Sequence, residues 1–202
     1  RDDKKGQVYF AVMRKPGRTA EEVVAEAVEA AVRNFPWPKS MRWGAGSLRW
    51  VRPLHSILCV LSDEADARVV PMDIDGIAAG DRTEGHRFLS PGSFAVTSFD
   101  DYAETLAAAH VVLDPAVRMA RIEADAAALA AAEGLEVVPD KGLLAEVAGL
   151  VEWPVVLMGD IEDQFLGLPP EVLQTSMKEH QKFFSVRNPK TGRLEKFITV
   201  AN

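Results

Sequence analysis

The sequence predicts an α+β fold with a mixed sheet or sandwich core and packed helices. Two observations favour this class: strand-like and helix-like stretches interleave without a strict β-α-β rhythm, and hairpin signals occur beside amphipathic helices. With 48% hydrophobic residues, the 202-residue chain can bury a substantial core. No repeat, linker or shift in composition marks a boundary, so we expect one α+β module over residues 1–202.

The first half is expected to hold two capped helices and several short strands. Thr19 and Glu22 have capping-box spacing before an apolar stripe that ends at Pro36, which predicts a helix. Ser98 and Asp101 open a second helix in the same way. Stretches rich in β-branched and apolar residues predict strands at residues 7–13, 56–61, 67–74 and 94–98.

The second half is expected to hold a long helix, two shorter ones and a hairpin. Asp114 as N-cap and Pro115 at the first helical position predict an alanine-rich helix that stops at Gly134. A shorter helix should end before Pro154, and another should lie within residues 168–181. Strands are expected at residues 110–113, 135–138, 155–160, 182–186 and 195–201, the last two joined by a turn over 187–194.

Charge is segregated along the chain, although the net charge is −7. No acid occurs between Glu29 and Asp63, an interval that contains Arg33, Lys39, Arg42, Arg49 and Arg52. A second basic stretch runs over residues 178–196, and residues 98–171 are strongly acidic. Such asymmetry can orient a protein toward a polyanion. The alternative is that solvated faces simply differ in sign.

Several classes of site lack their sequence signatures. Cys59 is the single cysteine, which excludes an internal disulfide and fits a reducing cytoplasm; its apolar neighbours favour a small buried residue. The four histidines show no metal-ligand spacing, and no serine-hydrolase or P-loop motif occurs. No secretory leader and no apolar run of about 20 residues is present. We expect a cytoplasmic chain with no metal, no cofactor, no catalytic residue and no membrane attachment.

Two histidines are open to more than one interpretation. His180 lies at helical spacing from Leu173 and Met177, which favours a buried histidine over one that touches a ligand. His86 and Arg87 follow turn signals, so we expect them in an exposed loop. In that loop, contact with an anion and ordinary loop polarity are equally open.

Five blocks of sequence carry a family resemblance. They are "PWPKSMRWG", "RWVRPLH", "GHRFL", "LVEWPVVLMG" and "LPPEVLQTSMKEHQKFF". In this order and with these separations they resemble the β chain of the bacterial-type glycyl-tRNA synthetases, over nearly the whole chain. The resemblance, with a start at Arg1 and an end inside an expected strand, implies an N-terminal to central piece of a longer β chain. It also implies a fold similar to the editing-type module of the phenylalanyl-tRNA synthetase β chain.

The resemblance further implies partners and a division of labour. In that family two α and two β chains assemble, the α chain activates glycine with ATP and magnesium, and the β chain binds tRNA. The chain is then a subunit of an aminoacyl-tRNA ligase. Its expected partners are the α chain and the tRNA for glycine, and ATP and magnesium belong to the α chain.

Arginine matches phosphate, and tryptophan can stack on an unpaired base or on a guanidinium. Under the resemblance, the candidate tRNA contacts are Arg42, Arg49, Arg52, His86, Arg87, Lys178, Gln181 and Lys182. Alternatively, the tryptophans pack in the core and the arginines bind carbonyl groups and acids such as Glu152 or Asp160. Two other functions stay open: a hydrolytic editing site using His55, His86 or His180, with His55 and His180 otherwise structural, and an architectural spacer that docks through the acidic middle.

Overall fold

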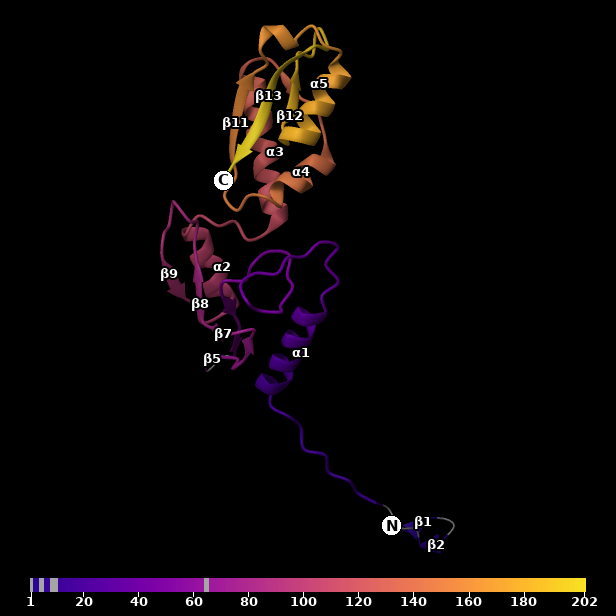
Figure 1. Cartoon of the computed structure of the whole chain (residues 1–202), viewed down its shortest axis with the longest axis vertical. Coiled ribbons are helices and arrows are strands. Elements are labelled where there is room, and N and C mark those ends of the chain that lie inside the picture. Colours follow the sequence, from indigo (N-terminus) through magenta and orange to yellow (C-terminus); the bar gives the residue numbers. More distant parts are fainter. Residues whose placement is uncertain (1, 4–5, 8–10, 64–65) are drawn as a thin grey trace. The chain divides into compact units, whose positions relative to one another are not determined.

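The computed structural model describes residues 2–3, 6–7, 11–63 and 66–202 of the chain (Figure 1). The chain divides into two compact units, Arg1–Asp81 (unit 1) and Arg82–Asn202 (unit 2). Both contain helices and small sheets, so the structure is mixed α and β, with five α-helices in the described residues. The single module expected over residues 1–202 remains a prediction, because a division of contacts does not decide whether the units fold independently.

Unit 1 contains helix α1 (Ala20–Asn34) with the predicted N-terminal cap. The Glu22 amide donates to Thr19 Oγ1 and the Thr19 amide donates to Glu22 Oε2, both at 3.3 Å. These two bonds satisfy amide groups that the first helical turn leaves without partners. The helix ends at Phe35, whose extended backbone is the conformation that the following Pro36 favours.

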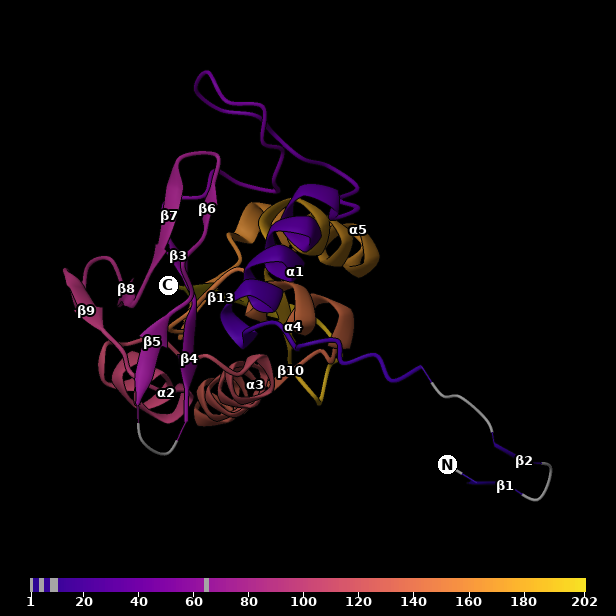
Figure 2. The same ribbon diagram turned by 90° about the horizontal axis from the view of Figure 1, so that it is seen from below.

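The strands of unit 1 are short and pair locally (Figure 2). They are β1 (Asp2–Asp3), β2 (Gly6–Gln7), β3 (Ile57–Leu58), β4 (Val60–Ser62), β5 (Ala67–Val69), β6 (Asp73–Ile74) and β7 (Ile77–Gly80). β1 with β2, β4 with β5 and β6 with β7 are antiparallel, whereas β3 pairs with β7 in parallel. Asp75 and Gly76, both with positive φ, form the tight turn between β6 and β7.

The strand predicted over residues 7–13 is wrong for residues 11–13. Gln7 belongs to β2, residues 8–10 lie outside the described residues, and residues 11–13 are exposed and irregular. The predicted strand over 56–61 is divided into β3 and β4 at Cys59, and its described side chains are half-buried or exposed rather than covered on both faces.

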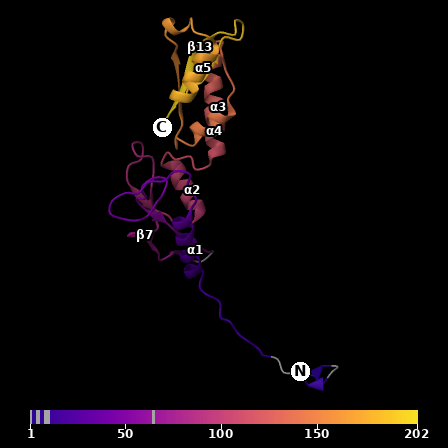
Figure 3. The ribbon, with the colours of Figure 1, turned by 45° about the vertical axis from the view of Figure 1, so that its right-hand side comes forward.

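Unit 2 is built around a four-stranded antiparallel sheet (Figures 1 and 3). Its strand order is β10 (Glu136–Val137), β12 (Phe184–Arg187), β13 (Leu194–Ala201) and β11 (Val155–Asp160). The predicted hairpin over the 187–194 turn is confirmed as β12 and β13. A separate hairpin pairs β8 (Arg82–Glu84) with β9 (Ser93–Ala95) before helix α2 (Phe99–Ala108).

Two helices, α3 (Pro115–Ala132) and α4 (Lys141–Ala148), lie side by side in unit 2 (Figures 1 and 3). The Asp114 carboxylate accepts the Ala116 amide at 2.7 Å, which confirms the predicted N-cap of α3. Gly134, at φ 72°, ends α3 as predicted. The Leu135 amide then bonds back to the Ala130 carbonyl at 2.9 Å, in the manner of a Schellman motif.

Apolar side chains from α3, α4 and the sheet form the core of unit 2. Its buried members include Ile122, Ala126, Val147, Phe184, Val186 and Ile198. The alanines of α3 allow the helix to approach its neighbours closely, as the sequence indicated. This core fixes the positions of the charged side chains around it.

The strand predicted at residues 110–113 is wrong, because its polar groups bond elsewhere. The Val112 amide donates to the Glu152 carbonyl at 2.8 Å, and the Arg118 guanidinium binds the Val112 and Leu113 carbonyls at 2.6 and 2.9 Å. His110 has φ 60°, which interrupts extended backbone. Apolar composition alone does not make a strand when no neighbouring strand accepts its ladder.

The helix predicted within residues 168–181 changes its winding part of the way along. Helix η1 (Asp163–Phe165) precedes α5 (Pro170–Ser176), and α5 continues as η2 (Met177–Gln181), a π-helical turn. Lys182 follows with φ 58°. A π turn holds more residues than an α turn, so the α-helical spacing no longer fixes which face the later side chains occupy.

We expect Ile198→Ala to destabilise unit 2 strongly. Ile198 is 0% exposed, and removing its buried atoms should lower the free energy of unfolding by about 2–5 kcal/mol. Leu157→Ala is the matched control, because Leu157 on the adjacent strand β11 is 51% exposed and should change stability by no more than about 0.5 kcal/mol. Urea unfolding followed by circular dichroism measures both. Equal losses in the two variants would contradict the assigned core.

Candidate nucleic-acid interface

The basic segment, which we define as residues 39–52, folds back on itself in unit 1. Met41 and Trp50 form an isolated antiparallel bridge, with amide-to-carbonyl distances of 2.8 and 3.2 Å in the two directions. Arg42 and Arg49 are the next residues inward from this bridge. The bridge therefore brings together the two backbone segments that carry these arginines, which are seven positions apart in sequence.

The cations of the basic segment are exposed and have no carboxylate partner among the described residues. They are Lys39, Arg42, Arg49 and Arg52. Arg49 Nε donates to Ser40 Oγ at 3.1 Å, and Arg52 donates to the Val51 carbonyl at 2.9 Å. The Asp75 carboxylate lies directly against Gly46, yet it forms no ion pair with these cations. Their charge stays available to an external anion.

Aromatic side chains support the base of the segment. Trp50 contacts Trp37 edge-on, with ring centroids 4.9 Å apart, and Phe35 packs on Trp37 at 4.4 Å. Trp43 and Trp50 are half-buried, so they are neither free stacking platforms nor full core residues. The guanidinium–tryptophan stacking that the sequence allowed occurs instead in unit 2, where Arg121 lies 4.2 Å from the centre of the Trp153 ring.

The second basic stretch, by contrast, is largely neutralised within unit 2. Lys178 pairs with Asp140 at 2.7 Å, and Lys182 pairs with Glu146 at 2.9 Å. Arg187 pairs with Glu136 at 2.6 Å, and Lys196 lies 2.8 Å from both Glu133 and Asp160. Asp160, named as a possible arginine partner, therefore binds a lysine. The acidic middle of the chain supplies the counter-charges, and contact of tRNA with Lys178, Gln181 or Lys182 remains a prediction.

The electrostatics of one pair show how this neutralisation works. The Leu143 amide and the Lys178 ammonium both hydrogen-bond Asp140, and they hold the pKa of this carboxyl below its usual range. The same contact raises the pKa of Lys178. Asp140 is at once the N-cap of α4 and the partner of a lysine from η2, so it joins two elements.

The histidines differ from their expected environments. His86 is 2% exposed, so the exposed loop position predicted for it is wrong; the amides of Phe88 and Leu89 hydrogen-bond its ring. Arg87 is exposed, as expected. His180 is exposed rather than buried, because the π turn rotates it off the stripe of Leu173 and Met177.

Within the described residues, no group of three His, Cys, Asp or Glu side chains could hold a metal ion. Burial raises the pKa of the Cys59 thiol, which disfavours the thiolate form that a nucleophile requires. Among the helices that the structure describes, none is long and apolar enough to cross a bilayer.

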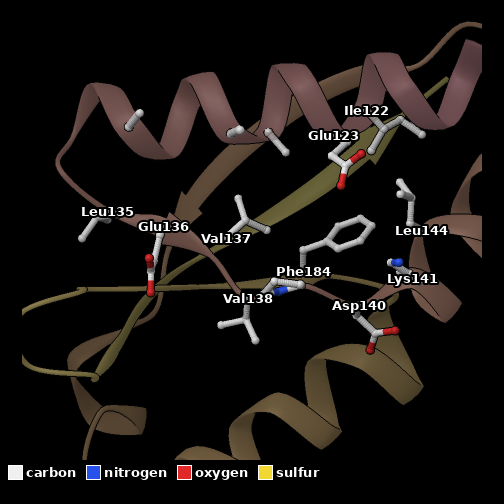
Figure 4. Close-up of a pocket in the computed structure, with 14 residues that line it drawn as sticks. Ile122, Glu123, Leu135, Glu136, Val137, Val138, Asp140, Lys141, Leu144 and Phe184 are labelled. Atoms are coloured by element: carbon white, nitrogen blue, oxygen red, sulfur yellow. The ribbon is translucent and has the colours of Figure 1, made fainter.

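Unit 2 contains an apolar cavity of about 410 Å³ between α3, β10 and the start of α4 (Figure 4). Val137, Leu144 and the ring of Phe184 point into it, and Glu123, Glu136 and Asp140 lie at its margin. Its apolar lining, with three carboxylates against the single cation Lys141, does not suit a phosphate. The cavity therefore differs from the basic segment in its charge.

The family follows from comparison with known proteins. A family model described as glycyl-tRNA synthetase beta subunit matches residues 1–202, and the chain belongs to this family. Relatives named glycine–tRNA ligase beta subunit include those of Paracoccus denitrificans (strain Pd 1222) and Ruegeria sp. (strain TM1040), each 70% identical over all 202 residues. That of Phenylobacterium zucineum (strain HLK1) is 55% identical over 96% of the chain. The chain spans about 30% of the length of these relatives.

We expect Asp140→Asn to remove part of the acid sensitivity of unit 2. A carboxyl whose pKa is lowered in the folded state contributes stability above its unfolded pKa of about 3.9, and this contribution is lost as pH falls through the folded value. The variant should be less stable than the natural protein at neutral pH and should approach it in acid. Urea midpoints measured from neutral to acidic pH give the comparison. Asp163→Asn, at an exposed acid with no ion pair in the described residues, should leave the pH profile unchanged; a parallel offset at every pH in Asp140→Asn would contradict the assignment.

Proposed function

We propose that this chain is part of a glycine–tRNA ligase β subunit and that its basic segment binds the tRNA backbone. The main support is the contrast between the two basic stretches: the cations of residues 39–52 have no carboxylate partner in the described structure, whereas those after Met177 are mostly paired. Unpaired arginines can exchange water for phosphate oxygens without first breaking an internal ion pair. Family membership makes tRNA the expected polyanion.

The proposed division of labour places the chemistry outside this chain. We propose that glycine activation with ATP and magnesium occurs on a partner α chain, in an assembly of two α and two β chains in the cytoplasm. The ion pairs of unit 2 suit the architectural part of the role. They join the C-terminal end of α3 to β13, β10 to β12, and α4 to Lys182 after η2.

We also retain the proposal that the fold is related to the editing-type module of the phenylalanyl-tRNA synthetase β chain. The mixed α and β elements are compatible with that kinship. A hydrolytic site would need an imidazole oriented by a second group. Neither His55 nor His180 has a hydrogen-bond partner in the described part of the chain, so a shared fold does not lead us to propose a shared reaction.

Reversing the charge of Arg42, Arg49 and Arg52 to Glu should weaken binding of the glycine tRNA by at least about tenfold at low salt. Each lost phosphate contact should also reduce the slope of log affinity against log salt by about 0.7–0.9, because fewer counterions are released. Filter binding with the intact ligase, over a series of salt concentrations, measures both quantities. Aminoacylation at limiting tRNA should fall in parallel.

The control is Lys190→Glu with Arg193→Glu, which reverses charge at two exposed cations of the β12–β13 turn that have no ion pair among the described residues. This variant should retain nearly all tRNA affinity if position matters more than total charge. Equal weakening in both variants would indicate a net-charge effect only. Unchanged binding in the triple variant would remove the basic segment from the interface.

A further inference from the structure

A second hollow in unit 2 combines positive charge with polar groups that lack partners. Its volume is about 510 Å³. The lining comes from the loop around His86, the segment before α3, the first turn of α3 and the residues after α4. Unlike the apolar cavity of Figure 4, it presents two arginines, Arg87 and Arg118. It involves none of the residues of the basic segment.

Arg118 provides a fixed positive charge at this hollow. Its Nε donates to the Ala148 carbonyl at 2.8 Å, and one terminal nitrogen donates to the carbonyls of Val112 and Leu113 at 2.6 and 2.9 Å. These bonds hold the guanidinium plane, but carbonyl groups do not neutralise its charge. No carboxylate among the described residues pairs with it, and its second terminal nitrogen has no partner there. A held guanidinium with free donors is suited to an oxyanion.

His86 lines the hollow with a ring whose position is set by the backbone. Its Nδ1 accepts the amides of Phe88 and Leu89 at 3.3 and 3.1 Å, so the proton of the neutral ring lies on Nε2. His86 is 2% exposed, and within the described structure Nε2 has no hydrogen-bond partner. The loop is held tightly: a Cβ at Gly85 would lie 2.5 Å from the Ala109 Cβ. Nε2 itself is buried, with less than 1 Å² accessible, so the ring forms part of the wall of the hollow and can report on its occupancy.

The remaining polar lining sets the charge balance. Arg87 is exposed, and its guanidinium carbon lies 5.6 Å from the centre of the Phe88 ring. Asn202 Oδ1 accepts the amides of Glu152 and Trp153 at 2.7 and 2.9 Å, which leaves the side-chain NH₂ group of Asn202 as a donor. Glu152 is the one acid among the residues that line the hollow, all of which are described. Two arginines against one carboxylate leave a net positive charge.

We propose that this hollow binds a phosphate group, held by Arg118 and Arg87 with the side-chain amide of Asn202 as a further donor. A phosphate offers several acceptor oxygens and a negative charge, which matches donors that converge from separate segments. The phosphate can belong to a nucleic-acid backbone or be free in solution. The site lies in unit 2 and does not rest on the function proposed for the basic segment.

The test is a titration of the natural chain with inorganic phosphate, and separately with a short single-stranded oligouridylate, followed by the ring nitrogen signals of His86 in NMR. The proposal expects saturable shifts of His86 with at least one probe. Shifts with the oligonucleotide alone identify a phosphodiester, and shifts with both identify the phosphate group itself. Absence of any His86 shift at millimolar concentrations of both probes overturns the proposal.

Two single variants give effects of opposite sign that a loss of structure would not produce. Arg87→Gln, at an exposed side chain, should weaken the binding of the responsive probe by about tenfold, as expected for one charge-assisted hydrogen bond. Glu152→Gln should strengthen it several-fold, because it removes the only negative charge of the lining. If Glu152→Gln weakens binding or leaves it unchanged, the proposed phosphate position is wrong. Charge reversal in the basic segment should not affect this titration. Failure of the phosphate site can therefore be distinguished from failure of tRNA binding by the basic segment.

Discussion

Pairing between the acidic helical region and the cations after Met177 decides which positive charges the protein can offer to a partner. Glu133, Glu136, Asp140, Glu146 and Asp160 supply the carboxylates, from the helices and strands that enclose the core of unit 2. Such partly exposed pairs add little stability individually. They nevertheless neutralise cations that would otherwise be available to an external anion.

The basic segment has no such compensation, because the chain places no acid between Glu29 and Asp63. The segment is also held by few contacts of its own. They are one backbone bridge and the aromatic contacts of Phe35, Trp37 and Trp50. A segment with few contacts of its own can adjust to an irregular surface such as RNA. An acidic protein can thus bind a polyanion when its negative charge is internally paired and part of its positive charge is not.

Local signals in the sequence were sufficient for much of the fold. The caps at Thr19 and Asp114, the stop at Gly134 and the C-terminal hairpin each depend on residues close in sequence, and all are confirmed. Long-range bonding could not be predicted. The loss of the strand at 110–113 depends on Arg118 and on the Glu152 carbonyl, and the exposure of His180 depends on a π turn that α-helical spacing does not reveal. Among the candidate site residues, the neutralisation of Lys178 and Lys182 required partners about 36 to 38 positions earlier, and no motif marked Arg118 or Asn202.

In the proposed function, tRNA contacts the unpaired arginines of the basic segment rather than the paired cations of unit 2. Modification of the intact ligase with an arginine-specific reagent, with and without glycine tRNA, tests this site by site through mass spectrometry. We predict that tRNA protects Arg42, Arg49 and Arg52, and leaves the reactivity of Arg187, which is paired with Glu136, unchanged. Protection of Arg187 with none in the basic segment would contradict the account.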